Sequence, residues 1–186
     1  MAGLKMRYRE PLPFTMPVLP EGYTLCTLES EAELQDCFEA CKEGLSLEEW
    51  TLEQFREVSL DRVGITMDQI YVVKDPGGKI VATATAWQRG EKEGYLHLVS
   101  ALPETRGMGF GYILCQKVLD FFLDQGINSI QLDTQDFRLP AIKIYLKLGF
   151  IPVLYDYDMA DRWRDVFDKL QLRTPVYRLR FEEMEL

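Results

Sequence analysis

The segment that decides the fold reads Ala101-Leu-Pro-Glu-Thr-Arg-Gly-Met-Gly-Phe-Gly111 and joins a predicted strand to a predicted helix. Its three alternating glycines, at 107, 109 and 111, leave backbone N–H groups unshielded, so that an anion can approach them. The N-terminus of the following helix adds roughly half a positive charge. The loop therefore predicts a phosphate or pyrophosphate ligand. The structural alternative is a tight strand-to-helix turn that needs glycine only for its backbone.

Two common nucleotide motifs do not fit this loop. A Rossmann G-x-G-x-x-G motif needs a third glycine, but the two possible frames place it at Tyr112 or at Leu114. A P-loop needs a Gly-Lys-Ser/Thr ending, which does not follow. The loop also comes after the middle of the chain, where a first Rossmann unit would not lie. Both interpretations are therefore weak.

Helices and strands alternate on the C-terminal side of the loop. After Gly109, apolar residues fall on one helical face until Gly126 ends the helix. The pattern then predicts a strand at 130–134, a helix from Pro140 to Gly149, a strand at 151–155, an amphipathic helix at 159–170 and a final strand at 175–181.

Antiparallel signals dominate on the N-terminal side. The pattern predicts a strand at 23–28, a helix from Ser30 to about Lys42 with Gly44 as its stop, and a second helix with a Ser46–Glu49 capping box. Strands at 69–73 and 80–87 flank a DPGG turn, and a third strand follows at 95–101. This order predicts a mixed α/β sheet, partly antiparallel and partly parallel, in one domain spanning residues 1–186.

Arg106, Gly109 and Gly111 give the loop the spacing Arg/Gln-x-x-Gly-x-Gly/Ala. In this it resembles the GNAT superfamily of acyl-CoA-dependent N-acetyltransferases, in which the loop cradles the coenzyme A pyrophosphate. Residues 132–150, which end in Tyr145-Leu-Lys-Leu-Gly-Phe150, resemble the next strand and helix of that family. The resemblance covers roughly residues 95–155. It implies a GNAT-like mixed, partly antiparallel central sheet with helices on both faces, and acetyl-CoA as co-substrate without a metal.

The resemblance also implies which residues contact acetyl-CoA. The pyrophosphate would lie on the loop, and the thioester arm on backbone N–H groups freed by a bulge or splay at the end of the preceding strand. Arg138 stands where the family often has Asn, so it would reach a phosphate or the pantetheine arm instead. The expected contacts are Val99, Ser100, Ala101, Arg106, Gly107, Met108, Gly109, Phe110, Gly111 and Arg138.

Two side chains are candidates for proton transfer. Tyr145 matches the family position that protonates the coenzyme A sulfur, and its structural alternative is a core tyrosine. His97, the sole histidine, has the ordinary pKa best suited to removing a proton from an amine, and it resembles a catalytic His position of the arylalkylamine branch. Strand alternation places Tyr95, His97 and Val99 on one face, with Leu96, Leu98 and Ser100 on the other. A structural histidine is the alternative, with Glu91, Glu93 or Glu104 acting through water, or no base at all.

The composition of the chain disfavours several classes of partner and several cellular locations. Thirty Asp and Glu against 21 Lys and Arg give a net charge of −9, which disfavours a nucleic-acid partner. The sequence lacks a run of about 18 apolar residues and a signal-peptide pattern, which disfavours a membrane span and export. Cys26, Cys37, Cys41 and Cys115 do not form a disulfide framework, and a single His argues against a metal site. We expect a cytoplasmic location.

These observations predict an N-acetyltransferase that moves an acetyl group from acetyl-CoA to a primary amine of a small molecule or peptide, by direct attack in a ternary complex. An alternative is a non-catalytic acyl-CoA-binding or sensing domain on the same fold. A third hypothesis is a structural or partner-binding module, suggested by the acidic surface and the charged segment 161–169. That segment could also wall the acceptor pocket, form a homodimer contact or simply cover the domain.

Overall fold

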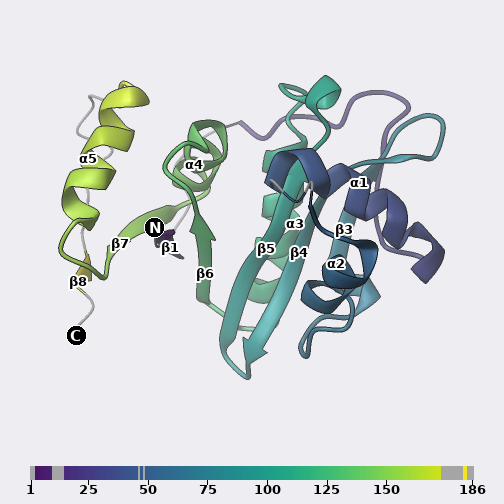
Figure 1. The fold of residues 1–186 in the computed structure, drawn as a ribbon, viewed down its shortest axis with the longest axis horizontal. Helices are drawn as coiled ribbons and strands as arrows, with labels where there is room; N and C mark the ends of the chain where they lie inside the picture. The colour runs from purple at the N-terminus through teal and green to yellow at the C-terminus, as the bar shows by residue number, and fades with distance from the viewer. Residues whose placement is uncertain (1–2, 10–14, 46, 48, 173–181, 184–186) are drawn as a thin grey trace. The chain divides into compact units, whose positions relative to one another are not determined.

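The computed structural model describes residues 3–9, 15–45, 47, 49–172 and 182–183. They fall into two compact units, one formed by Thr15–Ile130 and the other by Met1–Phe14 together with Gln131–Leu186. Figure 1 labels the helices and all the strands of both units except β2.

The unit of residues 15–130 is built on four antiparallel strands. They follow the order β2 (Thr24–Thr27), β3 (Ile70–Lys74), β4 (Ile80–Gly90) and β5 (Glu93–Ala101). Asp75 accepts backbone N–H bonds from Gly77 and Lys79, which closes the predicted turn between β3 and β4.

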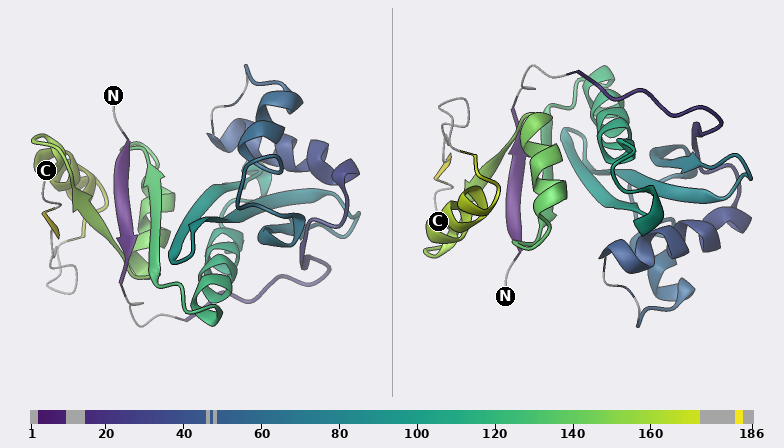
Figure 2. Two further views of the ribbon diagram at one scale, coloured as in Figure 1. Left: turned by 90° about the horizontal axis from the view of Figure 1, so that it is seen from below. Right: turned by 90° about the horizontal axis from the view of Figure 1, so that it is seen from above.

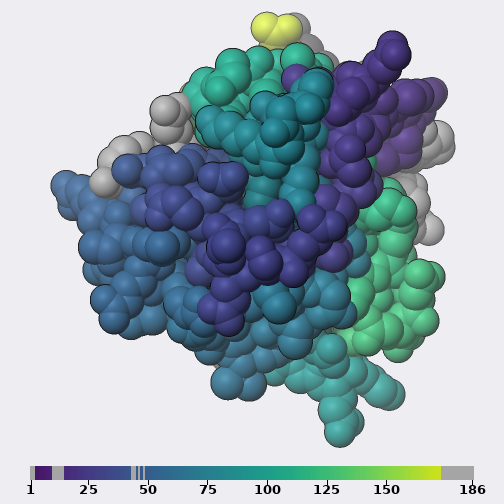
Figure 3. Space-filling view, turned by 90° about the vertical axis from the view of Figure 1, so that its right-hand side faces the viewer, coloured from purple at the N-terminus to yellow at the C-terminus, as the bar shows by residue number. Residues whose placement is uncertain are grey.

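Helices cover both faces of this sheet, as Figure 2 shows. Every residue of β4 from Ile80 to Ala86 is buried, which requires cover on both sides. Helices α1 (Leu34–Leu45) and α2 (Leu52–Val58) lie on one face and α3 (Phe110–Asp124) on the other. Residues of α1 and α2, coloured blue, form much of the surface seen in Figure 3. The predicted mixed sheet with helices on both faces is confirmed.

Close contacts fix the two helical layers to β5. On one side, the Ser100 hydroxyl donates to the carbonyl of Ala40 in α1 over 2.8 Å. On the other side, a Cβ at Gly94 would lie 2.9 Å from the ring of Phe122 in α3. The absence of a side chain at this one position therefore allows α3 to approach the strand.

The second unit contains β6 (Ser129–Thr134), β1 (Leu4–Tyr8), β7 (Phe150–Leu154) and β8 (Glu182–Glu183), in that order. Strand β1 is antiparallel to both β6 and β7, and β8 is parallel to β7. Sequence analysis missed β1, although its burial alternates strictly along Leu-Lys-Met-Arg-Tyr. That period of two is the signal that predicts a strand.

Helices α4 (Leu139–Lys147) and α5 (Met159–Lys169) complete this unit. Helix α5 is the amphipathic helix predicted at 159–170. It buries Met159, Trp163, Val166 and Phe167. Arg162 of α5 forms a two-pronged ion pair with Asp136, at 2.9 and 2.5 Å, which connects α5 to the segment between β6 and α4. Helix α5 therefore has a buried apolar face and a fixed anchor.

Some predicted boundaries were wrong. The capping box of α2 is formed by Thr51 and Gln54, whose side chains and backbone N–H groups bond reciprocally, and the helix begins only at Leu52. Helix α1 follows a 3-10 turn at Glu31–Glu33 and continues through Gly44 to Leu45. Two further 3-10 turns occur at Met67–Gln69 and Pro103–Thr105. The predicted strand at 175–181 and the predicted cap Ser46 lie outside the described residues.

Candidate active site

The glycine loop between β5 and α3 has the backbone that the sequence predicted. Gly107 and Gly109 both have φ of +86°, a conformation that side chains strongly disfavour. Gly109 is the N-cap of α3, so the helix begins directly behind the loop. A Cβ at Gly109 would lie 2.6 Å from Cβ of Pro17. Glycine is therefore required at 109 by the fold itself.

Four N–H groups of this loop have no acceptor among the described residues. Those of Arg106 and Met108 bond to the carbonyls of Pro103 and Thr105 over 3.2 and 3.3 Å and stabilise the turn. Among the residues the structure describes, the N–H groups of Gly107, Gly109, Phe110 and Gly111 donate to no protein acceptor. Four unused donors at the positive end of a helix of 15 residues are an arrangement that suits an anion. Two of the six predicted N–H donors are thus already used within the loop.

The side chains of the loop divide into anchors and exposed residues. Phe110 is buried and packs against Tyr23, with ring centroids 5.0 Å apart. Thr105 is also buried, and its hydroxyl donates to the carbonyl of Leu102 over 2.9 Å. Arg106, Gly107 and Met108 are exposed. The loop therefore holds a fixed backbone while its outer surface stays accessible.

A β-bulge interrupts β5 just before the loop. His97 pairs with Thr85 and Ser100 pairs with Thr83, so three steps along β5 match two steps along β4. Leu98 within the bulge has φ of +49°, which is unfavourable for a residue with a side chain. Leu98, Val99 and Ala101 remain partly accessible. The expected bulge is confirmed, and it lies at Leu98 and Val99.

The bulge corrects the predicted faces of β5. Thr83 and Thr85 are two residues apart on β4 and share a face, so their partners His97 and Ser100 share a face as well. Simple alternation had placed these two residues on opposite faces and was wrong. The extra residue in the bulge is the physical reason.

His97 lies in a cluster that also contains Trp87 and Tyr95. Its ring centroid is 5.5 Å from that of Trp87 and 6.0 Å from that of Tyr95. Its Nε2 lies 2.9 Å from the carbonyl of Val58 at the end of α2. Because a carbonyl only accepts, Nε2 carries the proton, and Nδ1 is the basic atom of the neutral ring. Burial lowers the pKa of His97 to about 4, so the ring is neutral at pH 7.

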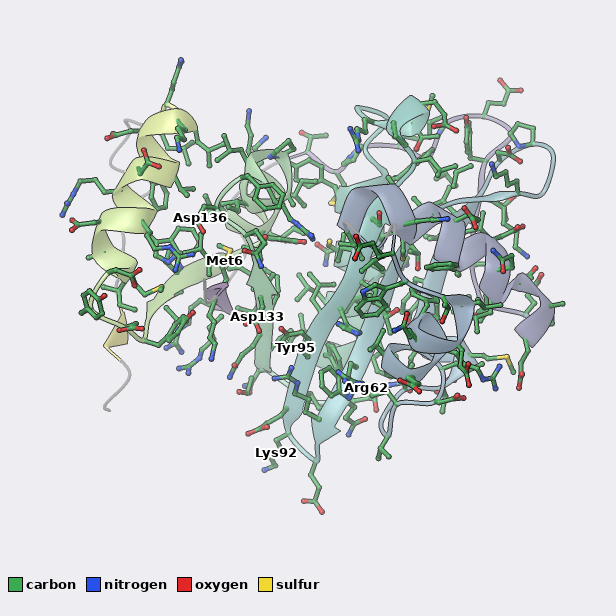
Figure 4. The ribbon with its side chains drawn as sticks, in the orientation of Figure 1. Met6, Arg62, Lys92, Tyr95, Asp133 and Asp136 are labelled. Atoms are coloured by element: carbon green, nitrogen blue, oxygen red, sulfur yellow. The ribbon has the colours of Figure 1, made fainter. Side chains whose placement is uncertain are left out.

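Two arginines stack on this aromatic cluster, a feature that sequence analysis missed. The guanidinium carbon of Arg62 lies 4.3 Å from the centroid of the Trp87 ring. That of Arg89 lies 4.1 Å from Trp87 and 3.6 Å from Tyr95. Figure 4 labels Arg62, from the loop after α2, and Tyr95, from β5. The residues come from three segments of the chain, so no local motif could have revealed the cluster.

Arg138 and Tyr145 belong to the second unit and lie seven residues apart, at the N-cap and in the body of α4. Two helical turns place them on the same side of the helix. Tyr145 is buried and packs edge-on against Phe150, with ring centroids 6.0 Å apart. The buried Nε of Arg138 has no hydrogen-bond partner, and burial lowers the pKa of this guanidinium. A partly buried guanidinium whose Nε has no acceptor fits a site for an anionic ligand.

All four cysteines are free thiols, and three of them are buried. Cys37 and Cys41 are both buried in α1, as the interpretation of two small core residues predicted. Burial raises the pKa of Cys37 to about 12, which keeps it a neutral thiol. Within the described ranges, no group of three or more His, Cys, Asp or Glu residues could hold a metal ion.

The model of the acetyltransferase (GNAT) family matches residues 31–150, which include the bulge, the glycine loop and α4. The chain belongs to the GNAT acetyltransferase family. This is a family of acyltransferase enzymes that use acetyl-CoA as co-substrate and act on amine acceptors.

Curated relatives of this GNAT chain are acetyltransferases. It is 28% identical to a mycothiol acetyltransferase of Thermobispora bispora, over 77% of this chain and 52% of that protein. It is 40% identical to human N-acetyltransferase 8B, over 32% of this chain and 26% of that protein. The GNAT chain spans about a quarter to a half of the length of these two relatives.

Solved structures confirm the GNAT fold. A GCN5-related N-acetyltransferase from Sphaerobacter thermophilus has a TM-score of 0.64 at 21% identity, over 82% of this chain and 49% of that chain. The ribosomal-protein-S18-alanine N-acetyltransferase of Escherichia coli has a TM-score of 0.56 at 18% identity, over 68% and 76%. At these identities the likeness concerns the fold. Among the helices described for this chain, none is long and apolar enough to span a membrane.

Proposed function

We propose that this protein transfers an acetyl group from acetyl-CoA to a primary amine of a small molecule or peptide, by direct attack in a ternary complex. The observation that carries the proposal is the set of four unused N–H donors at Gly107, Gly109, Phe110 and Gly111. Such donors match the oxygens of a pyrophosphate, and family membership identifies which pyrophosphate compound to expect.

Three groups of residues would bind acetyl-CoA along its length. The loop Arg106–Gly111 would hold the pyrophosphate, and the backbone at Val99, Ser100 and Ala101 would bind the thioester arm beside the bulge. Arg138, a cation without an acceptor at Nε, would neutralise a phosphate or contact the pantetheine arm. When bound, acetyl-CoA supplies an acetyl thioester activated for attack by an amine.

In this proposal His97 and Tyr145 transfer the protons. An amine must lose a proton before it can attack, and the Nδ1 of His97 is the imidazole atom able to accept it, since Nε2 is bonded to Val58. Tyr145 would donate a proton to the departing thiolate.

A second function also has a specific observation in its favour. With a pKa of about 4, His97 is a weak base, and its Nε2 is engaged in fixing α2 to β5. A structural His97 favours either positioning of an already neutral amine or a non-catalytic acyl-CoA-binding domain. The two functions differ in turnover, and not in binding of acetyl-CoA.

The deciding experiment combines binding and turnover on the same protein. Titration calorimetry with acetyl-CoA tests the site itself, and we expect saturable binding with a stoichiometry of one. Release of free coenzyme A thiol is then measured over a panel of amino acids, polyamines, aminoglycosides and short peptides. Tight binding without turnover on any amine supports the sensor, and absence of binding overturns both functions.

The proposal also includes a domain organisation and a cellular location. The family match at residues 31–150 includes parts of both compact units, which supports a single acetyltransferase domain over residues 1–186. All four cysteines are free thiols, which fits the reducing cytoplasm that the sequence suggested.

A further inference from the structure

The cluster around Trp87 carries two positive charges, those of Arg62 and Arg89. Within the described part of the chain, neither Arg62 nor Arg89 forms an ion pair. Other arginines do so readily: Arg56 pairs with Glu31 and Asp61, and Arg164 with Asp161. In a chain with a net charge of −9, carboxylates are abundant, so two neighbouring arginines without one stand out.

The way these arginines are held leaves their hydrogen-bonding edges available. The guanidinium carbons lie over the rings of Trp87 and Tyr95, and within the described residues neither guanidinium donates a hydrogen bond. The N–H donors of a guanidinium group lie in its plane. Arg89 is exposed and Arg62 is partly exposed, so a ligand can reach both. Planar guanidinium groups with free N–H edges match the geometry of a carboxylate.

Contacts with backbone groups hold the Trp87 ring and the neighbouring part of β4 in place. The indole N–H of Trp87 donates to the carbonyl of Val63 over 3.0 Å, and the N–H of Gln88 donates to Gly64 over the same distance. A Cβ at Gly64 would lie 2.0 Å from the carbonyl oxygen of Gln88, so the approach of this loop to β4 requires glycine. Arg62, at the start of this contact, is therefore placed beside β4 by the fold.

The cluster includes His97, the proposed base, and lies beside the bulge where the thioester arm would bind. Tyr95 and His97 are two residues apart on one face of β5, and the bulge at Leu98 and Val99 follows directly. With a rise of about 3.3 Å per residue, Tyr95 and the bulge are roughly 10 Å apart. A small molecule could therefore present its amine near the bulge and another group near the arginines.

We propose that Arg62 and Arg89 bind a carboxylate of the acceptor, which makes the acceptor a small anionic amine of the acidic amino acid class. This proposal rests on the acetyl transfer proposed above. It assigns the two arginines a role in specificity, and it leaves the contacts with acetyl-CoA unchanged.

The test compares L-glutamate with L-glutaminamide, which has the same shape and α-amine but no carboxylate. Calorimetry with the full chain saturated with coenzyme A should show glutamate binding at least tenfold more tightly, because a hydrogen bond between charged groups is stronger than one to a neutral amide. Arg62→Gln combined with Arg89→Gln should remove this preference and leave the affinity for glutaminamide within about twofold. Arg164→Gln, which removes a surface charge on α5, is the matched control and should keep it.

The outcomes separate this proposal from the one it rests on. Failure of wild type to bind acetyl-CoA overturns the transfer function. Binding of acetyl-CoA with equal affinities for the two amines, or with no binding of either, overturns only the carboxylate site. A preference that survives in the double variant also overturns it. Should the double variant not fold, Arg89→Gln alone carries the test, because Arg89 is exposed and its loss should still reduce the preference several-fold.

Discussion

His97 and Ser100 face the same side of the sheet although they are three residues apart, because their partners Thr85 and Thr83 are two residues apart on β4. Their hydrogen bonds then fix both helices of that side: His97 bonds to Val58 of α2, and Ser100 to Ala40 of α1. The backbone between them, at Leu98 and Val99, is the bulge beside which we place the thioester arm. One extra residue in β5 thus sets both the packing of the helices and the shape of the proposed site.

His97→Gln tests the cost of burying a neutral imidazole. The pKa of His97 is about 4 in the folded protein against an ordinary value of 6.5, so between these values the unfolded chain binds more protons. Above about pH 6.5 the protonation of His97 therefore does not affect the free energy of unfolding. As the pH falls from 6.5 toward 4, His97 makes the folded state progressively less stable. The loss attributable to His97 should reach about 3 kcal/mol. Chemical denaturation from pH 4 to 8 should show a shallower dependence for the variant, and equal slopes would contradict the low pKa.

The same variant tests the proposed base. If His97 removes the proton from the amine, kcat/KM should fall by about 10²–10⁴-fold. The acid limb of the pH–rate profile should lie near pH 4 in the wild type, not near 6.5, and should disappear in the variant. A normal rate with an unchanged profile would assign proton removal to water, to a glutamate or to no residue.

Gly111→Val tests the approach of the pyrophosphate to the loop. Gly111 lies in the first turn of α3 and does not have a positive φ, so a side chain there does not strain the backbone. We expect the affinity for acetyl-CoA to fall at least tenfold while the melting temperature changes by a few degrees. Gly90→Val is the control, because no heavy atom lies within 4 Å of its Cβ position. Gly109→Val cannot serve as this test, since its φ of +86° and its contact with Pro17 would destabilise the fold.

Arg138→Gln and Arg162→Gln form a matched pair in the second unit. Arg138 has a buried Nε without an acceptor, so its removal should leave stability unchanged or raise it slightly, while acetyl-CoA binds about tenfold more weakly. Removal of Arg162 leaves Asp136 without its partner and should lower stability with little effect on binding. Melting curves and calorimetry on both variants measure the contrast. Equal effects of the two substitutions on binding would remove Arg138 from the proposed site.

The elements that sequence patterns predicted are those with local signals. The turn at Asp75–Gly78, the face of α3 and the glycine loop each depend on neighbouring residues, and the structure confirms them. The place of β1 between β6 and β7 depends on pairing with residues more than 120 positions away. The bulge in β5 was expected from the resemblance alone, since its register is set by β4.

The surroundings of His97 could not be predicted from the sequence, because they too depend on residues that are distant along the chain. Its hydrogen-bond partner, Val58, is 39 residues away, and Arg62 stacks on Trp87 from a loop 25 positions earlier in the chain. Sequence could identify the imidazole as a candidate base. Its low pKa follows from burial and from two arginine charges that only the fold brings close.

Tyr145→Phe tests whether this residue serves the leaving group or only the fold. The substitution keeps the ring that packs against Phe150 and removes only the hydroxyl, so the free energy of unfolding should change by about 1 kcal/mol or less. The maximal rate should fall by about 10²-fold or more, because a thiolate leaves more slowly without a proton donor. The affinity for acetyl-CoA should change far less than the rate, since the hydroxyl matters most as charge develops on sulfur.

The control for this prediction is Tyr155→Phe in the same unit. The hydroxyl of Tyr155 donates to the carbonyl of Gly3, so its loss should lower the melting temperature and leave the rate of transfer unchanged. The two variants remove the same atom from two tyrosines. Tyr145→Phe should lower the rate of transfer, and Tyr155→Phe should lower the melting temperature. If Tyr145→Phe instead melts much earlier at unchanged activity, Tyr145 is a structural tyrosine of α4, and another group must protonate the thiolate.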